Sequence, residues 1–208
     1  MPSEFPTLTG NHFRLEPIGL HHVDGLLAAA TADPSLYQWT VVPQMREAMQ
    51  TYVEAAMALR EACTGLAFTT VRIEDGSVIG ATRFFDMERW SWPVGHARHG
   101  NPHPDVCEIG YTWLTRSAIR TAANTEAKLM MLAHAFEVWQ MVRVCLHTDA
   151  RNERSRAAME RIGCKFEGTL RSHRMASDFI PRDSARYSIT AAEWPEAKQR
   201  LMEMATAR

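Results

Sequence analysis

The sequence lacks a long hydrophobic run and carries almost no net charge. No stretch approaches the roughly 18 apolar residues that a membrane helix needs, so a membrane-spanning protein is not expected. The formal net charge is −1, from 23 basic and 24 acidic side chains. This balance gives no overall preference for nucleic acid or for an anionic membrane surface, so we expect neither as a partner.

Cysteine pairs and a secretory signal are missing as well. The four cysteines are widely spaced and form no C-x-x-C pair: Cys63, Cys107, Cys145 and Cys164. The first residues contain no basic segment followed by an apolar one, as a secretory signal would. We therefore expect a reduced, cytoplasmic protein.

The patterns that are present predict an α/β (α+β) protein. Apolar residues make up 46% of the 208 residues, enough for one sizeable core, and we expect a single domain over 1–208. Strands are predicted at 13–18, 66–73, 78–85, 106–114, 143–148, 164–170 and 186–190, and helices at 21–33, 45–62, 125–139, 152–163 and 193–207. This order predicts a mixed sheet with helices on both faces.

The stretch from 107 to 163 has the layout of a cofactor site. A polar turn at 115–124 separates a strand from an apolar helix, whose N-cap is predicted to be Asn124 or Thr125. Backbone N–H groups at such a turn can hold phosphates. A later helix opens at Asn152, with Ser155 in its first turn. We expect a phosphate-bearing ligand here, with its reactive end between two strands.

The strand at 106–114 contains two unusual residues. Glu108 places a carboxylate in a strand that otherwise looks buried, which requires a partner, solvent access or a chemical role. Gly110 suggests a β-bulge, or a ligand that passes close to the backbone.

Three segments together resemble a known family. They are EIGYTWL at 108–114, RTAANTEAKLMML at 120–132 and TDARNERSRAAMERIGCKFEGTLR at 148–171, followed by YSI at 187–189 and EWP at 193–195. The sequence resembles the GCN5-related N-acetyltransferase (GNAT) superfamily, and in particular the ribosomal-protein N-terminal alanine and serine acetyltransferases. The resemblance spans roughly residues 13–195.

This resemblance implies a twisted mixed sheet of about seven strands, whose fourth and fifth strands splay apart around acetyl-CoA. The implied cofactor-binding residues are Tyr111, Trp113 and Leu114 on the strand edge, Arg120, Thr121, Ala122, Ala123, Asn124 and Thr125 in the pyrophosphate loop, and Asn152 and Ser155. Many relatives carry glycines in this loop, which this chain lacks. Backbone N–H groups do not require glycine. Arg120 is expected to pair with a phosphate or to be a solvated loop arginine.

Acetyl transfer to an amine needs a proton acceptor and a proton donor. Glu108 is the candidate acceptor, directly or through water, or else a structural carboxylate paired with an arginine. Many relatives use a tyrosine as donor where this chain has Met159, which excludes that donor. Ser155 is the alternative donor, or it caps its helix and binds the cofactor. Tyr111 is a weaker candidate, because strand tyrosines usually pack.

We expect an acyl-CoA-dependent N-acyltransferase, which transfers acetyl to a primary amine of a small molecule or of a protein N-terminus. Two alternatives are a non-catalytic acyl-CoA-binding sensor domain and an enzyme for a larger acyl group such as succinyl. The terminal helix, with Leu201, Met202 and Met204, either forms a homodimer or completes the core.

Residues 86–105 fit neither a helix nor a strand and predict a long loop. No metal is expected on its histidines, His96, His99 and His103, because the loop lacks a rigid frame and cysteines. The loop is either a lid over the acceptor or an exposed segment. Trp90 and Trp92 either line an acceptor pocket or pack the loop against itself.

Overall fold

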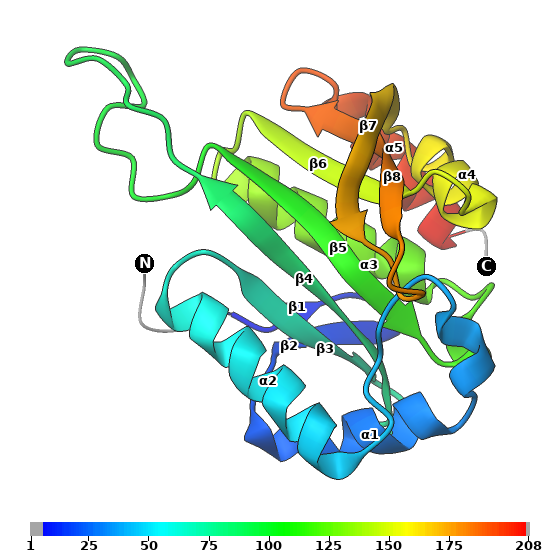
Figure 1. Ribbon diagram of the computed structural model, residues 1–208. Helices are drawn as coiled ribbons and strands as arrows, with labels where there is room; N and C mark the ends of the chain where they lie inside the picture. Colours follow the sequence, from blue (N-terminus) through cyan, green and yellow to red (C-terminus); the bar gives the residue numbers. More distant parts are fainter. Residues whose placement is uncertain (1–5, 207–208) are drawn as a thin grey trace.

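A single sheet organises the computed structural model, which describes residues 6–206 (Figure 1). Within those residues the sheet has eight strands in the order β1-β2-β3-β4-β5-β6-β8-β7. The strands are β1 (Leu8–Thr9), β2 (Phe13–Pro17), β3 (Leu66–Arg72), β4 (Val78–Glu88), β5 (Val106–Leu114), β6 (Arg143–Asp149), β7 (Lys165–Met175) and β8 (Pro181–Thr190). All neighbours are antiparallel except β5 and β6, which are parallel.

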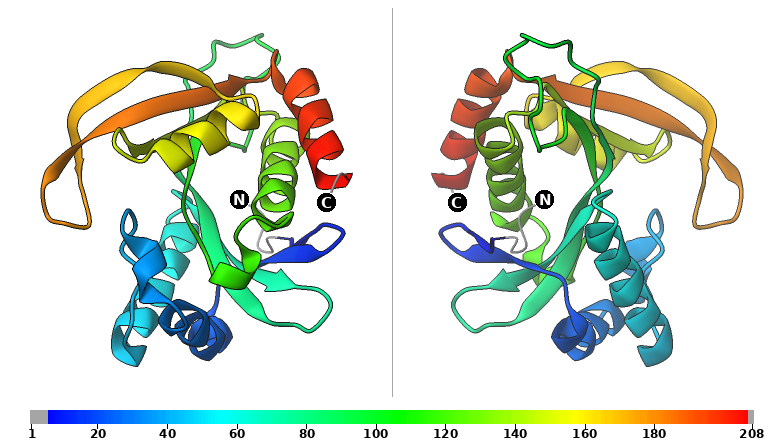
Figure 2. Two further views of the ribbon diagram at one scale, coloured as in Figure 1. Left: turned by 90° about the vertical axis from the view of Figure 1, so that its right-hand side faces the viewer. Right: turned by 90° about the vertical axis from the view of Figure 1, so that its left-hand side faces the viewer.

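Helices cover both faces of this sheet, as predicted (Figures 1 and 2). The α-helices are α1 (Val23–Thr31), α2 (Arg46–Glu61), α3 (Ala123–Ala133), α4 (Glu153–Arg161) and α5 (Trp194–Thr206). Short 3-10 turns lie at Leu20–His22, Pro34–Tyr37 and Arg116–Ala118, and a π-helical turn at His134–Val138 extends α3. None of the helices within 6–206 is long and apolar enough to cross a bilayer.

Buried apolar residues among 6–206 form three clusters, and the two largest, one on each face, hold helices to the sheet. Phe84 and Ile109 belong to the larger core, with Leu132 of α3 and Leu201 of α5. The smaller core joins α1 and α2 to the opposite face, where Trp113 is only 4% exposed. Because neighbouring residues in a strand face opposite sides, β4 and β5 contribute to both cores.

The predicted fold class is confirmed, with three differences in detail. The sheet has eight strands instead of about seven, because the two-residue β1 is too short to give a periodic signal. Helix α3 begins two residues before the predicted 125, and its N-cap is Ala122, so the prediction of Asn124 or Thr125 as the cap was wrong. The predicted end of the last helix at Ala207 lies outside the described residues.

The third difference is the length of the last hairpin. The strands β7 and β8 continue beyond the predicted 164–170 and 186–190, and their pairing extends to Met175 opposite Pro181. The added residues are mostly polar or exposed, so no apolar alternation marks them in the sequence.

A lysine lies buried between α3 and the sheet. Lys128 is 5% exposed, and its Nζ donates to Thr112 Oγ1 at 2.9 Å and lies 3.5 Å from Thr82 Oγ1. Within residues 6–206 it forms no ion pair with a carboxylate. Burial lowers the pKa of Lys128 from 10.5 to about 8, because an unpaired ammonium is poorly solvated there.

We predict that Lys128→Met stabilises the protein below pH 8. The unfolded chain holds the lysine proton up to about pH 10.5 and the folded chain only up to about 8, so wild-type stability rises through this window. In the variant, the Thr82 and Thr112 hydroxyl groups, which lost the lysine, still hydrogen-bond to each other at 2.8 Å. Urea unfolding should show the variant more stable at pH 7, by on the order of a few kcal/mol, and nearly equal to wild type at pH 10.5. A pH-independent difference would contradict this account.

Candidate functional site

Strands β5 and β6 lie side by side only where they begin. Three residue pairs join them, and the last is Glu108 opposite Cys145. From Ile109 to Leu114, β5 pairs with β4 on one side and, within the described residues, with no strand on the other. This confirms the predicted splay of the two strands and leaves a row of backbone N–H and C=O groups on the free edge of β5.

A β-bulge interrupts β5 along this free edge. Arg83 pairs with Gly110 and Ala81 with Trp113, so Tyr111 and Thr112 together oppose one residue of β4. Tyr111 has φ 50°, in the left-handed region. At Gly110 a Cβ atom would lie 2.9 Å from Phe85 Cε1, which leaves no room for a side chain. The bulge suggested by this glycine is therefore present.

The turn between β5 and α3 brings backbone N–H groups to the end of the same edge. Arg120 is exposed and has φ 64°, so an arginine takes the left-handed conformation that glycine adopts more easily. Ala122 and Ala123 are buried, and the Ala123 N–H donates to Thr121 Oγ1 at 3.2 Å. The N-cap residue Ala122 makes no side-chain cap, and the first N–H groups of a helix, such as those of Asn124 and Thr125, have no partner inside the helix. Such groups favour an anion.

At the start of α4, the structure separates the roles proposed for Asn152 and Ser155. Asn152 is the N-cap, and its Oδ1 accepts a hydrogen bond from the Ser155 N–H at 3.1 Å. The capping role considered for Ser155 therefore belongs to Asn152. The Ser155 side chain is half-buried, and Met159, one turn further on, is 8% exposed and part of the larger core.

Glu108 is buried and paired with an arginine. It is 5% exposed, and its Oε2 accepts a hydrogen bond from Arg174 Nη2 at 2.9 Å. The same nitrogen donates to the exposed Asp86 at 2.8 Å. Although burial opposes it, the two carboxylates raise the pKa of Arg174. The arginine partner considered for Glu108 exists, 66 residues away on the hairpin.

A histidine that sequence reasoning did not single out lies beside this pair. His147 Nδ1 is 2.8 Å from Glu108 Oε2, at ion-pair distance, but the angles do not form a hydrogen bond and both ring nitrogens are buried without a hydrogen-bond partner. The His173 ring lies 5.1 Å away. Burial and the nearby charge of Arg174 lower the pKa of His173. The available signal was the strand period, which places His147 on the same face as Cys145.

The loop that follows β4 is organised by a buried aspartate. Asp105 accepts hydrogen bonds from the Trp90 N–H (2.7 Å), from Trp92 Nε1 (2.8 Å) and from Arg98 Nε (2.8 Å). Although burial would raise it, these bonds hold the pKa of Asp105 below its ordinary value. The loop projects beyond the ends of β4 and β5 (Figure 1), and its tryptophans are attached to its own base.

The loop histidines make local hydrogen bonds. His96 Nδ1 accepts from the Arg98 N–H, and His99 Nδ1 lies 2.8 Å from the Trp92 carbonyl oxygen. Within 6–206, three possible metal ligands gather elsewhere, at Glu16, His21 and His22. There His22 bonds through both ring nitrogens, to Glu16 Oε2 at 2.9 Å and to the Gly19 N–H at 3.2 Å.

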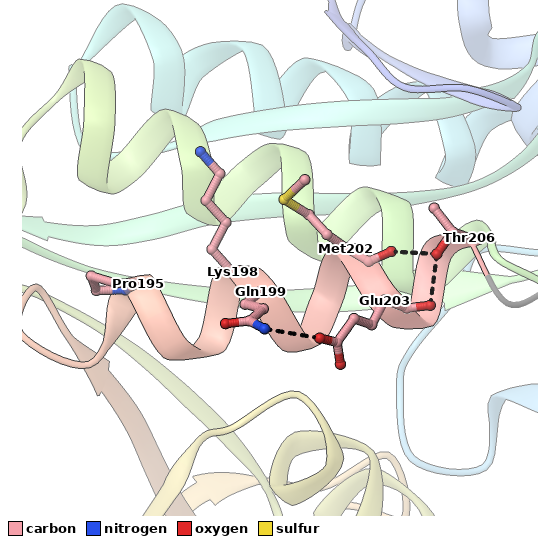
Figure 3. A pocket seen from close by; sticks show the side chains of 6 residues that line it. All are labelled: Pro195, Lys198, Gln199, Met202, Glu203 and Thr206. Carbon is pink, nitrogen blue, oxygen red and sulfur yellow. Dashed lines mark hydrogen bonds between the residues drawn. The ribbon is translucent and has the colours of Figure 1, made fainter.

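The terminal helix carries a surface hollow of about 420 Å³ (Figure 3). It is lined by Pro195, Lys198, Gln199, Met202, Glu203 and Thr206. None of the residues predicted for catalysis or cofactor binding lines this hollow. Leu201 is fully buried in the larger core, whereas Met202 is 50% exposed, so α5 completes the core and a homodimer stays a prediction.

We predict that Asn152→Ala destabilises the protein by about 1 kcal/mol, because it removes the cap of α4. Asn152→Asp is the matched control and should retain most of the stability, since its carboxylate accepts the same bond. Ser155→Ala should change the free energy of unfolding little, because only its backbone N–H takes part in the cap. Urea unfolding at pH 7 measures all three; a larger loss for Ser155→Ala would refute this assignment.

Comparisons with known proteins agree with this architecture. Residues 12–165 match the family model of the acetyltransferase (GNAT) domain. YdaF of Bacillus subtilis strain 168, provisionally named a ribosomal N-acetyltransferase, is 33% identical over 91 residues, which are 44% of this chain and only 49% of YdaF.

Two solved structures share the fold. A GCN5-related N-acetyltransferase from Brucella melitensis superposes with a TM-score of 0.82 at 26% identity, over 97% of this chain and 86% of that one. Mycobacterium smegmatis RimJ, in complex with CoA-disulfide, has a TM-score of 0.74 at 21% identity, over 92% and 88% of the two chains. The family model covers most of the chain, and the chain therefore belongs to the GNAT acetyltransferase family.

Proposed function

We propose that this protein transfers an acetyl group from acetyl-CoA to the primary amine of a protein N-terminus. The observation that carries the proposal is the free edge of β5, which begins at Ile109, after the last pair with β6, and leads toward the start of α3. The choice of a protein N-terminus follows the resemblance to ribosomal-protein N-terminal acetyltransferases, and the name of YdaF, a ribosomal N-acetyltransferase, supports a protein acceptor. The choice of CoA rests on RimJ, a protein of the same fold.

The free edge offers groups that suit the parts of a CoA molecule. Pantetheine contains amides, which can pair with the backbone of Tyr111, Trp113 and Leu114 as a further strand would. The pyrophosphate would be held by the turn of Arg120, Thr121, Ala122, Ala123, Asn124 and Thr125. There the helix N-terminus and one guanidinium favour an anion. Asn152 and Ser155 would contact the arm from the opposite side of the gap.

Acetyl-CoA supplies an activated acyl thioester. The protein must remove one proton from the acceptor amine and deliver one proton to the departing thiolate. The acceptor amine attacks in its neutral form, so a proton has to leave it. We assign this role to Glu108. Glu108 Oε2 accepts the hydrogen bond from Arg174. Glu108 Oε1 lies beside Gly110: a Cβ atom added to this glycine would be 3.7 Å from Oε1. Arg174 holds the carboxylate in place, and Oε1 accepts the proton directly or through water.

The departing thiolate requires a proton in return. Met159 has no acidic proton and is buried in the core. Ser155 is the candidate donor, because no hydrogen bond from its hydroxyl is present within residues 6–206 and the α4 cap does not depend on it. The missing tyrosine is also the observation that favours the second candidate function, a domain that binds acyl-CoA without catalysis.

We predict that Glu108→Gln lowers kcat by about 100-fold on a peptide with a free N-terminal serine or alanine. Asp86→Asn is the matched control, because Asp86 bonds the same Arg174 nitrogen but is exposed. It should retain most of the activity. Mass spectrometry of the peptide amine measures acetyl transfer, and a rise in Tm with acetyl-CoA checks that both variants bind the cosubstrate.

Equal rates for Glu108→Gln and wild type would remove Glu108 as the proton acceptor. If acetyl-CoA raises the Tm but no amine in a broad panel is acetylated, the protein is a binding domain and the proposed reaction is wrong.

A further inference from the structure

Two arginines beside Glu108 have no carboxylate partner. Arg83 of β4 and Arg182 of β8 are both half-buried, and within residues 6–206 neither forms an ion pair. A guanidinium taken partly out of water without a counter-charge is costly, so such a group requires an explanation.

Both arginines lie around the Tyr111 side chain. The Arg83 guanidinium carbon is 3.3 Å from the centroid of the Tyr111 ring, which itself packs edge-on against Phe85 at 5.0 Å. Arg182 is paired across the hairpin with Arg174. Tyr111 lies close enough to influence the pKa values of Arg174 and Arg182. The bulge in β5 therefore presents Tyr111 against the Arg83 guanidinium, with Arg182 close enough to interact with it electrostatically.

The acidic groups nearby are already engaged. Arg174 forms ion pairs with both Glu108 and Asp86. Asp149, the acidic neighbour of Arg182, is bound through both oxygens by Arg151, at 2.9 and 2.7 Å. Within residues 6–206, no carboxylate therefore forms an ion pair with Arg83 or Arg182.

Unsatisfied hydrogen-bond donors gather in the same place. On β4, β6, β7 and β8 the buried polar atoms without a hydrogen-bond partner are Arg83 Nε, His147 Nδ1 and Nε2, His173 Nδ1, Arg182 Nε, Ser184 Oγ and Arg186 Nε. Two of them, His147 Nδ1 and Arg186 Nε, lie at ion-pair distance from Glu108 and Glu167. Buried polar groups are nearly always bonded, so a concentration of open ones indicates a ligand that supplies acceptors. All of these residues are on β4, which pairs with one side of β5, or on β6, β8 and β7, which follow β5 on its other side.

The hairpin brings these residues over the sheet face that carries Glu108. In both views of Figure 2 the hairpin of β7 and β8 extends away from the sheet, toward the connection between α1 and α2. Its tip is fixed there, since Ser177 Oγ donates to the Gln38 carbonyl oxygen. Arg151, beside the hairpin, lies 5.2 Å above the Trp39 ring. Arg174 of this hairpin bonds Glu108 and is paired with Arg182, and Arg83 lies opposite Gly110, two residues from Glu108.

We propose that Arg83 and Arg182 bind a carboxylate on the acceptor, so that the preferred substrate is an amine with an acidic group a few bonds away. This inference rests on the proposed function and specifies its substrate class. An aspartate or glutamate next to a protein N-terminus has this chemistry, and so does a free amino acid. A basic residue at the same position would be repelled.

The test compares peptides that differ in one residue. Peptides beginning Ser-Glu, Ser-Gln and Ser-Lys, and free glutamate, are measured for kcat/KM and, with CoA in place of acetyl-CoA, for binding by calorimetry. Wild type should prefer Ser-Glu over Ser-Gln by about tenfold or more and react least with Ser-Lys. A higher kcat/KM for free glutamate would identify a small-molecule acceptor with the same charge.

The preference should disappear in Arg182→Met and in Arg83→Met, so that the Ser-Glu and Ser-Gln peptides react with similar kcat/KM within each variant. Arg182→Lys should retain part of the preference for Ser-Glu over Ser-Gln. Arg200→Met, on the exposed side of α5, is the matched control and should behave as wild type. Equal rates for Ser-Glu and Ser-Gln in wild type, or an equal loss for every peptide in the arginine variants, would overturn the inference. Selective binding of Ser-Glu without any transfer would support it and contradict the proposed reaction.

Discussion

The structure depends on where the pairing between β5 and β6 stops. Backbone N–H and C=O groups in a sheet interior are almost always paired, so a central strand with a free edge is exceptional. Here two neighbouring strands separate after Glu108, in the middle of an eight-stranded sheet. The free edge leads, through the 3-10 turn at Arg116–Ala118, to the N-terminus of α3.

The chemical groups are arranged around this point of separation. Glu108 is the last residue of β5 to pair with β6, and the bulge at Tyr111 follows it directly. The hairpin then contributes Arg174 and Arg182 from the far edge of the sheet. The site is thus assembled from segments far apart in the sequence, and the rigid sheet sets their spacing. In the account proposed here, the free edge binds the acyl donor and the arginines select the acceptor.

Sequence reasoning reached the fold and the edge because both have local signals. The bounds 106–114 of β5 were predicted as observed, because the strand is apolar and flanked by Asp105 and Thr115. Gly110 marked the bulge beside it. The cap of α4 has a local signal too, since asparagine is a favoured N-cap, but the capping role was considered for Ser155 and not for Asn152.

The partners of Glu108 could not be predicted in the same way. His147 lies in a strand whose other residues are largely apolar, and Arg174 lies where polar residues hide the strand period. Only the pairing of β7 with β8, and the curvature of that hairpin, brings Arg174 to within 2.9 Å of a carboxylate 66 positions away. No local pattern encodes such a contact. The same reason explains why Arg83 and Arg182 were not singled out.

The central claim is that the free edge of β5 and the start of α3 bind acyl-CoA. Amide hydrogen exchange with and without acetyl-CoA tests it most directly, because it reports on these backbone groups themselves. The account predicts slower exchange at residues 109–114 and 120–125, with α5 unchanged. Slower exchange confined to other parts of the chain, or no change at saturating acetyl-CoA, would contradict it.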